Sequence, residues 1–144
     1  MFRKTMLAVA LAAAVGSAEA GKDFNIGLEV IGTFETGVFD EGAAEIVSYD
    51  RWSRRLFVVN ADANSVDVLD IRDPGNPQKL FSIDVADDLP LAGGVNSVAV
   101  SRWGLVGVAV ENDDKQADGW AAFYTRSGRF LGSAPAGALP DAIT

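Results

Sequence analysis

The stretch SYDRWSRRLFVVNADANSVDVLDI, Ser48 to Ile71, alternates short apolar runs with polar clusters that favour turns. Its two apolar runs, 56–59 and 66–71, are too short for buried helices and are rich in residues that favour strands. Between them lies Asn60–Ser65, a cluster of turn-forming residues. The stretch therefore predicts two antiparallel strands joined by a turn.

The same pattern extends on both sides of this pair. A strand at 45–49 precedes it, and a strand at 80–83 follows the break at 73–77, where two prolines cannot donate to a sheet ladder. The order then starts again, with apolar segments at 95–100, 105–110, 120–124 and around 130–131. The sequence therefore predicts two units of four short strands, and no helix after residue 20.

An Arg-Trp pair marks the same place in both units, because Arg51-Trp52 recurs fifty-one residues later as Arg102-Trp103. Asn96-Ser97-Val98 is likewise followed forty-five residues later by Asp141-Ala142-Ile143. Four strands per unit at such spacings are typical of β-propeller blades. We predict an all-β fold, a β-propeller fragment with about two four-stranded antiparallel blades, at 44–94 and 95–136, and the first strand of a third blade at 137–144.

An N-terminal strand and lead-in are expected at 21–43, with alternating apolar residues over Asn25–Phe34. This strand has no local partner, and in closed propellers a strand of this kind commonly completes the last blade. The alternative is that it pairs within the chain. Two blades and one strand leave unpaired edges, so further blades are needed to close the ring.

The first twenty residues have the pattern of a cleaved, helical signal peptide. Arg3 and Lys4 form a short positive region, 6–15 is apolar, and Ala18-Glu19-Ala20 fits a small-x-small cleavage site. A membrane anchor is the weaker interpretation, since a span needs about 20 apolar residues. We expect the mature chain to be secreted, periplasmic or at the cell surface, with no membrane span. Without cysteine, it has no disulfide.

The excess of acidic over basic residues limits the kinds of partner that the chain can bind. The whole chain has 12 basic and 20 acidic residues, and cleavage after Ala20 removes Arg3, Lys4 and Glu19, which leaves a net charge of −9. This surface repels phosphate backbones and anionic lipid, so nucleic acid is excluded as a partner. A protein or small-molecule ligand stays open, and simple solubility is the plainer explanation of the charge.

Familiar catalytic constellations are missing from the sequence. The chain has no histidine, so Ser-His-Asp hydrolysis and histidine-bound zinc are excluded within it. No nucleophile elbow, phosphate-binding loop or dinucleotide-binding pattern occurs. We therefore expect no catalytic residues in this chain.

Carboxylates are the only chemically active side chains that the sequence groups together. Alternate loops of an antiparallel blade lie at opposite ends, so the loops after each second strand and those between blades share one end. The candidate binding residues at this end are Asp62, Asp87, Asp88, Glu111, Asp113, Asp114 and Asp118. Oxygen-rich loops suit calcium, which makes Asp113, Asp114 and Asp118 candidate metal ligands. The alternative is a solvated face with no cofactor, since Asp and Asn favour turns.

Trp52 and Trp103 are predicted to lie in the turn between the first and second strands of each blade. Their recurrence favours a structural role, in which each ring covers the edge of its blade. The alternative is that the rings stack on a ligand.

The chain contains, in order, GTFETGVFDEGAAEIVSYD, LFVVNADANSVDVLDIRDPGNP, GGVNSVAVS, GLVGVAVE and GALPDAIT. Together these segments resemble the N-terminal part of the choice-of-anchor I family. The resemblance implies an exported, largely bacterial β-propeller related to YVTN-type repeats, of which this chain is a fragment. It implies a binding or surface-interaction module without catalytic apparatus in this chain. Because some members carry an alkaline phosphatase label, the alternative is the N-terminal segment of a metal-dependent phosphoesterase whose active site lies in missing blades.

Overall fold

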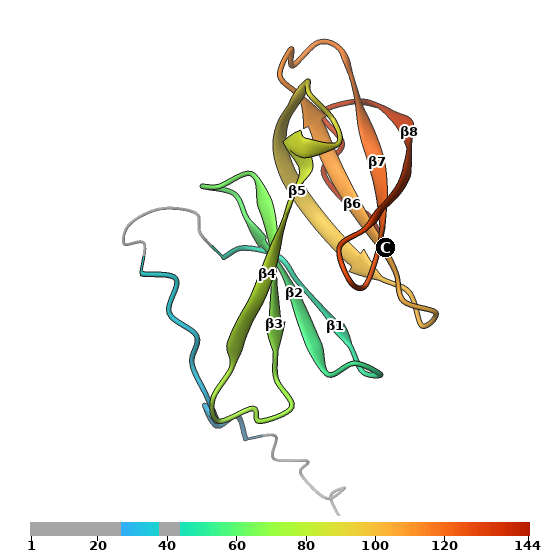
Figure 1. Ribbon diagram of the computed structural model, residues 1–144. Helices are drawn as coiled ribbons and strands as arrows, with labels where there is room; N and C mark the ends of the chain where they lie inside the picture. The colour runs from blue at the N-terminus through green and yellow to red at the C-terminus, as the bar shows by residue number, and fades with distance from the viewer. Residues whose placement is uncertain (1–26, 38–43) are drawn as a thin grey trace, which may run out of the picture.

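The computed structural model describes residues 27–37 and 44–144. The signal-peptide prediction for 1–20 lies outside these residues. The described chain forms two four-stranded antiparallel sheets, with strand orders β1-β2-β3-β4 and β5-β6-β7-β8 (Figure 1). The all-β prediction with two four-stranded antiparallel units is therefore confirmed.

The strands of the first sheet are β1 (Val47–Asp50), β2 (Arg55–Asn60), β3 (Ser65–Asp70) and β4 (Gln78–Asp84). A single 3-10 turn, η1 (Val85–Asp87), leads to the second sheet, which contains β5 (Ala92–Val100), β6 (Leu105–Asn112), β7 (Asp118–Thr125) and β8 (Phe130–Ala138). The second sheet begins three residues before the expected blade start at 95 and ends two residues after the expected end at 136. No helix in the described part of the chain is long and apolar enough to cross a membrane.

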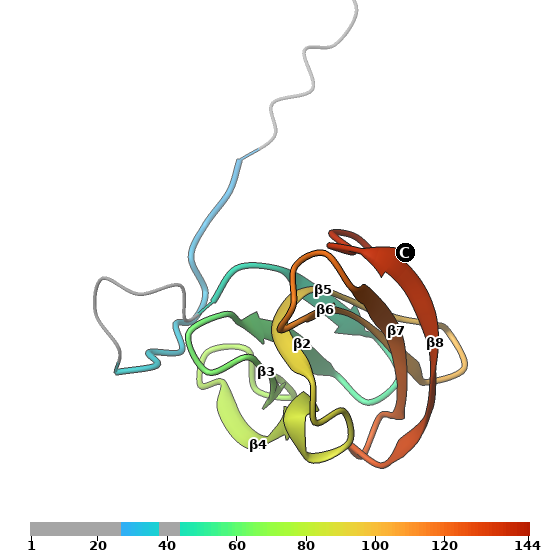
Figure 2. The same ribbon diagram turned by 90° about the horizontal axis from the view of Figure 1, so that it is seen from above.

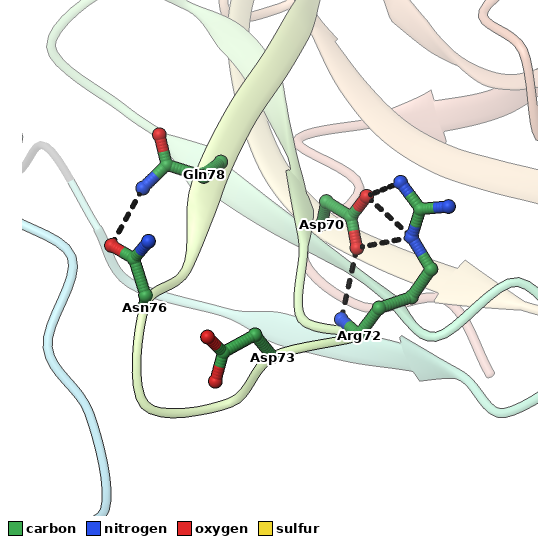
Figure 3. A pocket seen from close by; sticks show the side chains of 5 residues that line it. All are labelled: Asp70, Arg72, Asp73, Asn76 and Gln78. Atoms are coloured by element: carbon green, nitrogen blue, oxygen red, sulfur yellow. Dashed lines mark hydrogen bonds and ion pairs between the residues drawn. The ribbon is translucent and has the colours of Figure 1, made fainter.

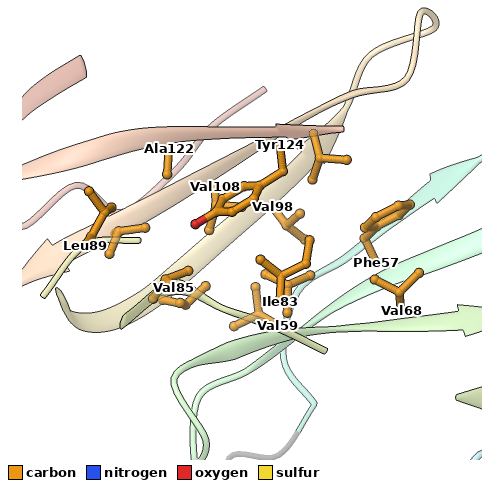
Figure 4. Packing of buried hydrophobic residues seen from close by; sticks show 14 residues of the cluster. Phe57, Val59, Val68, Ile83, Val85, Leu89, Val98, Val108, Ala122 and Tyr124 are labelled. Atoms are coloured by element: carbon orange, nitrogen blue, oxygen red, sulfur yellow. The ribbon is translucent and has the colours of Figure 1, made fainter. Parts of the chain in front are cut away.

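The hydrophobic core lies between the two sheets (Figure 4). Every second residue of β2 and β3 faces it, and the register pairs Phe57 with Val68 and Val59 with Val66. The second sheet contributes a matching buried face: Val98, Val106, Val108, Val110, Ala122 and Tyr124. In Figure 2 the strands β5 to β8 pack beside the first sheet, as neighbouring propeller blades do.

The first strands of the blades are linked in a repeated way. The Ser48 hydroxyl of β1 accepts a hydrogen bond from the Val100 N–H of β5 at 3.0 Å. The Ser97 hydroxyl of β5 in turn accepts one from the Ile143 N–H at 3.3 Å. A Cβ added at Gly107 would lie 2.7 Å from the Ile143 side chain, so Ile143 packs directly on the outer face of the second sheet.

The segment 139–144 thus lies beside β5 in the way that β5 lies beside β1. The strand expected at 137–144 is not formed there: Gly137 and Ala138 belong to β8, and no strand is assigned to 139–144. No other described segment pairs with these residues, and a strand is defined by its ladder.

The N-terminal strand expected at 25–34 is absent from its described part, 27–34. These residues run along the outside of the first sheet (Figures 1 and 2), with Leu28 98% exposed. Phe34 lies against the outer face of the sheet, where it lines a small pocket of about 140 Å³ with Val58 and Leu69. The apolar alternation is present, but no strand edge is paired with it, so it forms no ladder.

Candidate functional site

Five arginines lie at one end of the sheets and the predicted acidic residues at the other, although the β3–β4 loop adds Asp73 to the first end and the β6–β7 turn adds Lys115 to the second. The β1–β2, β5–β6 and β7–β8 turns lie at one end and contain five arginines: Arg51, Arg54, Arg102, Arg126 and Arg129. The β2–β3, β4–β5 and β6–β7 turns lie at the other end, which holds the predicted acidic residues. Asn64 of the first blade and Glu111 of the second both lie within 4 Å of a Cβ built at Gly94, so the acidic turns of the two blades meet.

Each predicted acidic residue is at that end. Asp62 lies in the β2–β3 turn, Asp87 and Asp88 lie at η1, and the β6–β7 region holds Glu111, Asp113, Asp114 and Asp118. Over residues 27–37 and 44–144, no group of three or more carboxylates could hold a metal ion. A calcium site at Asp113, Asp114 and Asp118 stays a prediction without support from this arrangement.

Two of these carboxylates serve local structure. Glu111 forms an ion pair with Lys115 and accepts a hydrogen bond from the Asn96 Nδ2 at 2.8 Å, and these two contacts lower the pKa of Glu111 below its ordinary value. Asn96 also donates to the Pro140 carbonyl, which ties β5 to the C-terminal segment. Asp114 accepts a hydrogen bond from the Gln116 N–H at 3.0 Å and so closes the β6–β7 turn.

At the opposite end, the two repeated tryptophans lie in the equivalent β1–β2 and β5–β6 turns. Trp52 is 67% exposed and Trp103 is 78% exposed. Neither ring packs into the core, and the structural role predicted for the two rings stays a prediction. Their exposure leaves the ligand-stacking alternative open.

The two turns converge on one pocket of about 660 Å³, lined by Arg51, Trp52, Arg102, Trp103 and Arg126, which we call the Arg-Trp pocket. Each arginine of a pair lies over the indole ring beside it. The Cζ atom is 5.2 Å from the ring centroid in the first pair and 4.1 Å in the second. Cation–π attraction therefore holds both guanidinium groups at the pocket wall.

Arg126 is the residue of this pocket that sequence reasoning missed. Its guanidinium lies on Gly104, where an added Cβ would be 2.3 Å from the Arg126 Nη2. Gly104 has a φ of +84°, which glycine adopts without strain. The Arg126 Nε lies 3.0 Å from the Asp50 Oδ2 in the other blade, and the Arg126 carbonyl accepts a hydrogen bond from the Arg55 Nη1. Arg126 therefore joins the two blades.

Asp50 is buried, with 3% of its surface exposed. Its carboxylate accepts hydrogen bonds from the Trp52 N–H at 3.1 Å and from the Ser53 hydroxyl at 2.6 Å. Burial alone would raise the pKa of Asp50, but these hydrogen bonds and the charge of Arg126 outweigh it and hold the pKa below its ordinary value of 3.8. The group is therefore a carboxylate at neutral pH and fixes the turn that carries Trp52.

A second pocket, of about 440 Å³, lies at the β3–β4 loop and is lined by Asp70, Arg72, Asp73, Asn76 and Gln78 (Figure 3). Here Arg72 forms a forked ion pair with Asp70, and the Gln78 amide donates to Asn76 at 2.8 Å. The pocket's only cation is thus already neutralised. Arg51 and Arg102 differ, since neither forms an ion pair with any residue that the structure describes.

A comparison with known proteins finds a family match for most of the described chain. The family model of the choice-of-anchor I domain matches residues 45–144, which contain both sheets, the Arg-Trp pocket and the C-terminal segment. No curated protein matches the chain.

Proposed function

The chain belongs to the choice-of-anchor I family, and from this premise we propose that it is an exported, propeller-type binding module that works at the cell surface. Family membership is consistent with a surface-associated module. The signal-peptide pattern of residues 1–20 supports export. In this proposal the ligand is a small molecule or a protein, and further blades complete the ring by covering the open faces of the two sheets.

The observation that carries the proposal is the convergence of two equivalent turns on one pocket. Propellers bind through turns held at the ends of a rigid scaffold, and here each blade supplies one exposed Arg-Trp pair to the same pocket. The scaffold beneath is rigid because both sheets bury a continuous apolar face against each other.

The proposal is tested by locating the full gene product in the cells that make it. An epitope-tagged chain is expressed from its own gene, and intact cells are treated with an added protease. We expect the tag to be digested in intact cells, whereas a variant without residues 2–20 stays protected inside the cytosol. A full-length product that remains in the cytosol would contradict the proposal.

A further inference from the structure

We propose that the Arg-Trp pocket binds a small organic polyanion, a molecule with at least two carboxylate or phosphate groups. This inference rests on the proposed function, because it names the ligand of the binding module. It follows from the charge, the geometry and the size of the pocket.

The charge of the pocket is opposite to that of the whole chain. The protein carries a net charge of −8 and has 12 basic side chains, of which three line this single pocket. One of the three, Arg126, is paired with the buried Asp50. Arg51 and Arg102 have no ion pair among the described residues, so the pocket keeps an excess of two positive charges. Two negative charges on a ligand would neutralise this excess.

The geometry prepares the arginines for oxyanions. A guanidinium that lies over an indole ring keeps the N–H groups along its edges available, and this planar fork matches the two oxygens of a carboxylate or a phosphate. Stacking also restricts the long arginine side chain before a ligand arrives, which lowers the entropy cost of binding. Lysines at these positions would provide neither feature.

The size and the lining of the pocket suit a small molecule. A volume of about 660 Å³ lies within the range of roughly 300–1,000 Å³ that is usual for small-molecule sites. Trp52 and Trp103 add exposed aromatic surface between the cations, which an organic anion can cover with its carbon skeleton. Because the two Arg-Trp pairs come from different blades, one ligand must bridge the boundary between the blades.

The test is a fluorescence titration of the purified chain, since two of its three tryptophans line the pocket. Citrate and pyrophosphate are the probes, acetate is the monovalent control, and ionic strength is held constant. We expect a saturable change with citrate, pyrophosphate or both, and none with acetate. The two arms separate a polycarboxylate ligand from a phosphate ligand.

Variants assign the signal to the pocket. Arg51→Gln combined with Arg102→Gln should weaken probe binding at least tenfold. Arg54→Gln combined with Arg129→Gln removes the same charge from the same end but outside the pocket, and should change binding less than twofold. All four side chains belong to exposed residues, so the variants should keep the melting temperature of the wild type. No saturable change with either polyanion, or equal losses in both double variants, would overturn the proposal.

The protease experiment on intact cells distinguishes this inference from the proposed function. If the chain reaches the surface but binds neither polyanion, the proposed exported function stands and the proposed ligand class is refuted. If the chain binds a polyanion through the pocket but stays in the cytosol, the proposed binding site stands and the exported function is refuted.

Discussion

Replacement of Arg126 by glutamine tests whether the two blades are joined through the Arg-Trp pocket. The change removes the cation that faces the buried carboxylate of Asp50 at 3.0 Å, while a polar side chain of similar reach remains. Asp50 keeps its hydrogen bonds from Trp52 and Ser53. The loss is therefore confined to the ion pair and to packing on Gly104.

The stability lost in Arg126→Gln lies between two limits. Removing one partner of a fully buried ion pair costs about 3–5 kcal/mol, whereas a surface pair contributes about 0–1 kcal/mol. The Asp50 side chain is 1% exposed but that of Arg126 is 37% exposed, so water screens one side of the pair. We expect Arg126→Gln to lower the free energy of unfolding by about 1–2 kcal/mol, between these limits.

Urea denaturation followed by circular dichroism measures this loss. With a slope of roughly 1–3 kcal/mol per molar urea, the midpoint should fall by about 0.3–2 M while the slope stays unchanged. Arg129→Gln, in the same turn, is the matched control and should change the free energy of unfolding by less than about 0.5 kcal/mol. Equal losses in the two variants would refute the idea that Arg126 joins the blades.

The Arg126–Asp50 ion pair also predicts that the stability of the fold depends on pH. Because the folded pKa of Asp50 lies below 3.8, its carboxylate contributes stability that is complete above that pH and is lost as the pH falls through the folded value. The difference in stability between the wild type and Arg126→Gln should therefore be full at neutral pH and shrink below about pH 4. A difference that stays constant down to pH 2 would show that the charge of Asp50 has no part in it.

Three further changes test other parts of the fold. Gly119→Ala should lower the free energy of unfolding by about 1–3 kcal/mol in calorimetry, because its Cβ would lie 2.4 Å from the Val110 carbonyl oxygen; a neutral result would contradict this packing. Tyr124→Phe should leave stability equal or raise it by up to about 1 kcal/mol, because the buried Tyr124 hydroxyl forms no hydrogen bond of good geometry, although Asp88 lies near it; a loss above about 2 kcal/mol would show that the hydroxyl donates to Asp88. Millimolar calcium should leave the melting temperature unchanged, because no three described carboxylates converge; a rise that disappears in Asp113→Asn combined with Asp114→Asn would establish the predicted metal site.

Local pattern was sufficient to predict the sheets. The turn at Asn60–Ser65 and the apolar runs beside it determine the β2–β3 hairpin, since each segment pairs with its neighbour along the chain. The lead-in at 27–37 has the same alternation but forms no strand, because pairing depends on an available edge and not on the segment itself. A strand therefore could not be inferred there from its own residues.

The site was predictable only in part, because its contacts join residues far apart in the sequence. Equivalent turns of neighbouring blades must lie close together, so the meeting of Trp52 and Trp103 follows from the repeat. The pairing of Arg126 with Asp50 does not, since it crosses from the last turn of one blade to the first turn of the other. At the acidic end, the carboxylates could be grouped from the sequence by the loops that carry them. The sequence could not show that Glu111 already accepts a hydrogen bond from Asn96 and forms an ion pair with Lys115.

The central claim is that two Arg-Trp turns from separate blades form one binding site, and nuclear magnetic resonance tests it most directly. The indole N–H signals of Trp52 and Trp103 are followed during a titration with citrate or pyrophosphate, with Trp120 as the internal reference because it does not line the pocket. We predict that both pocket signals shift together with a single dissociation constant while Trp120 stays in place. Shifts of only one pocket tryptophan, or two different dissociation constants, would contradict a shared site.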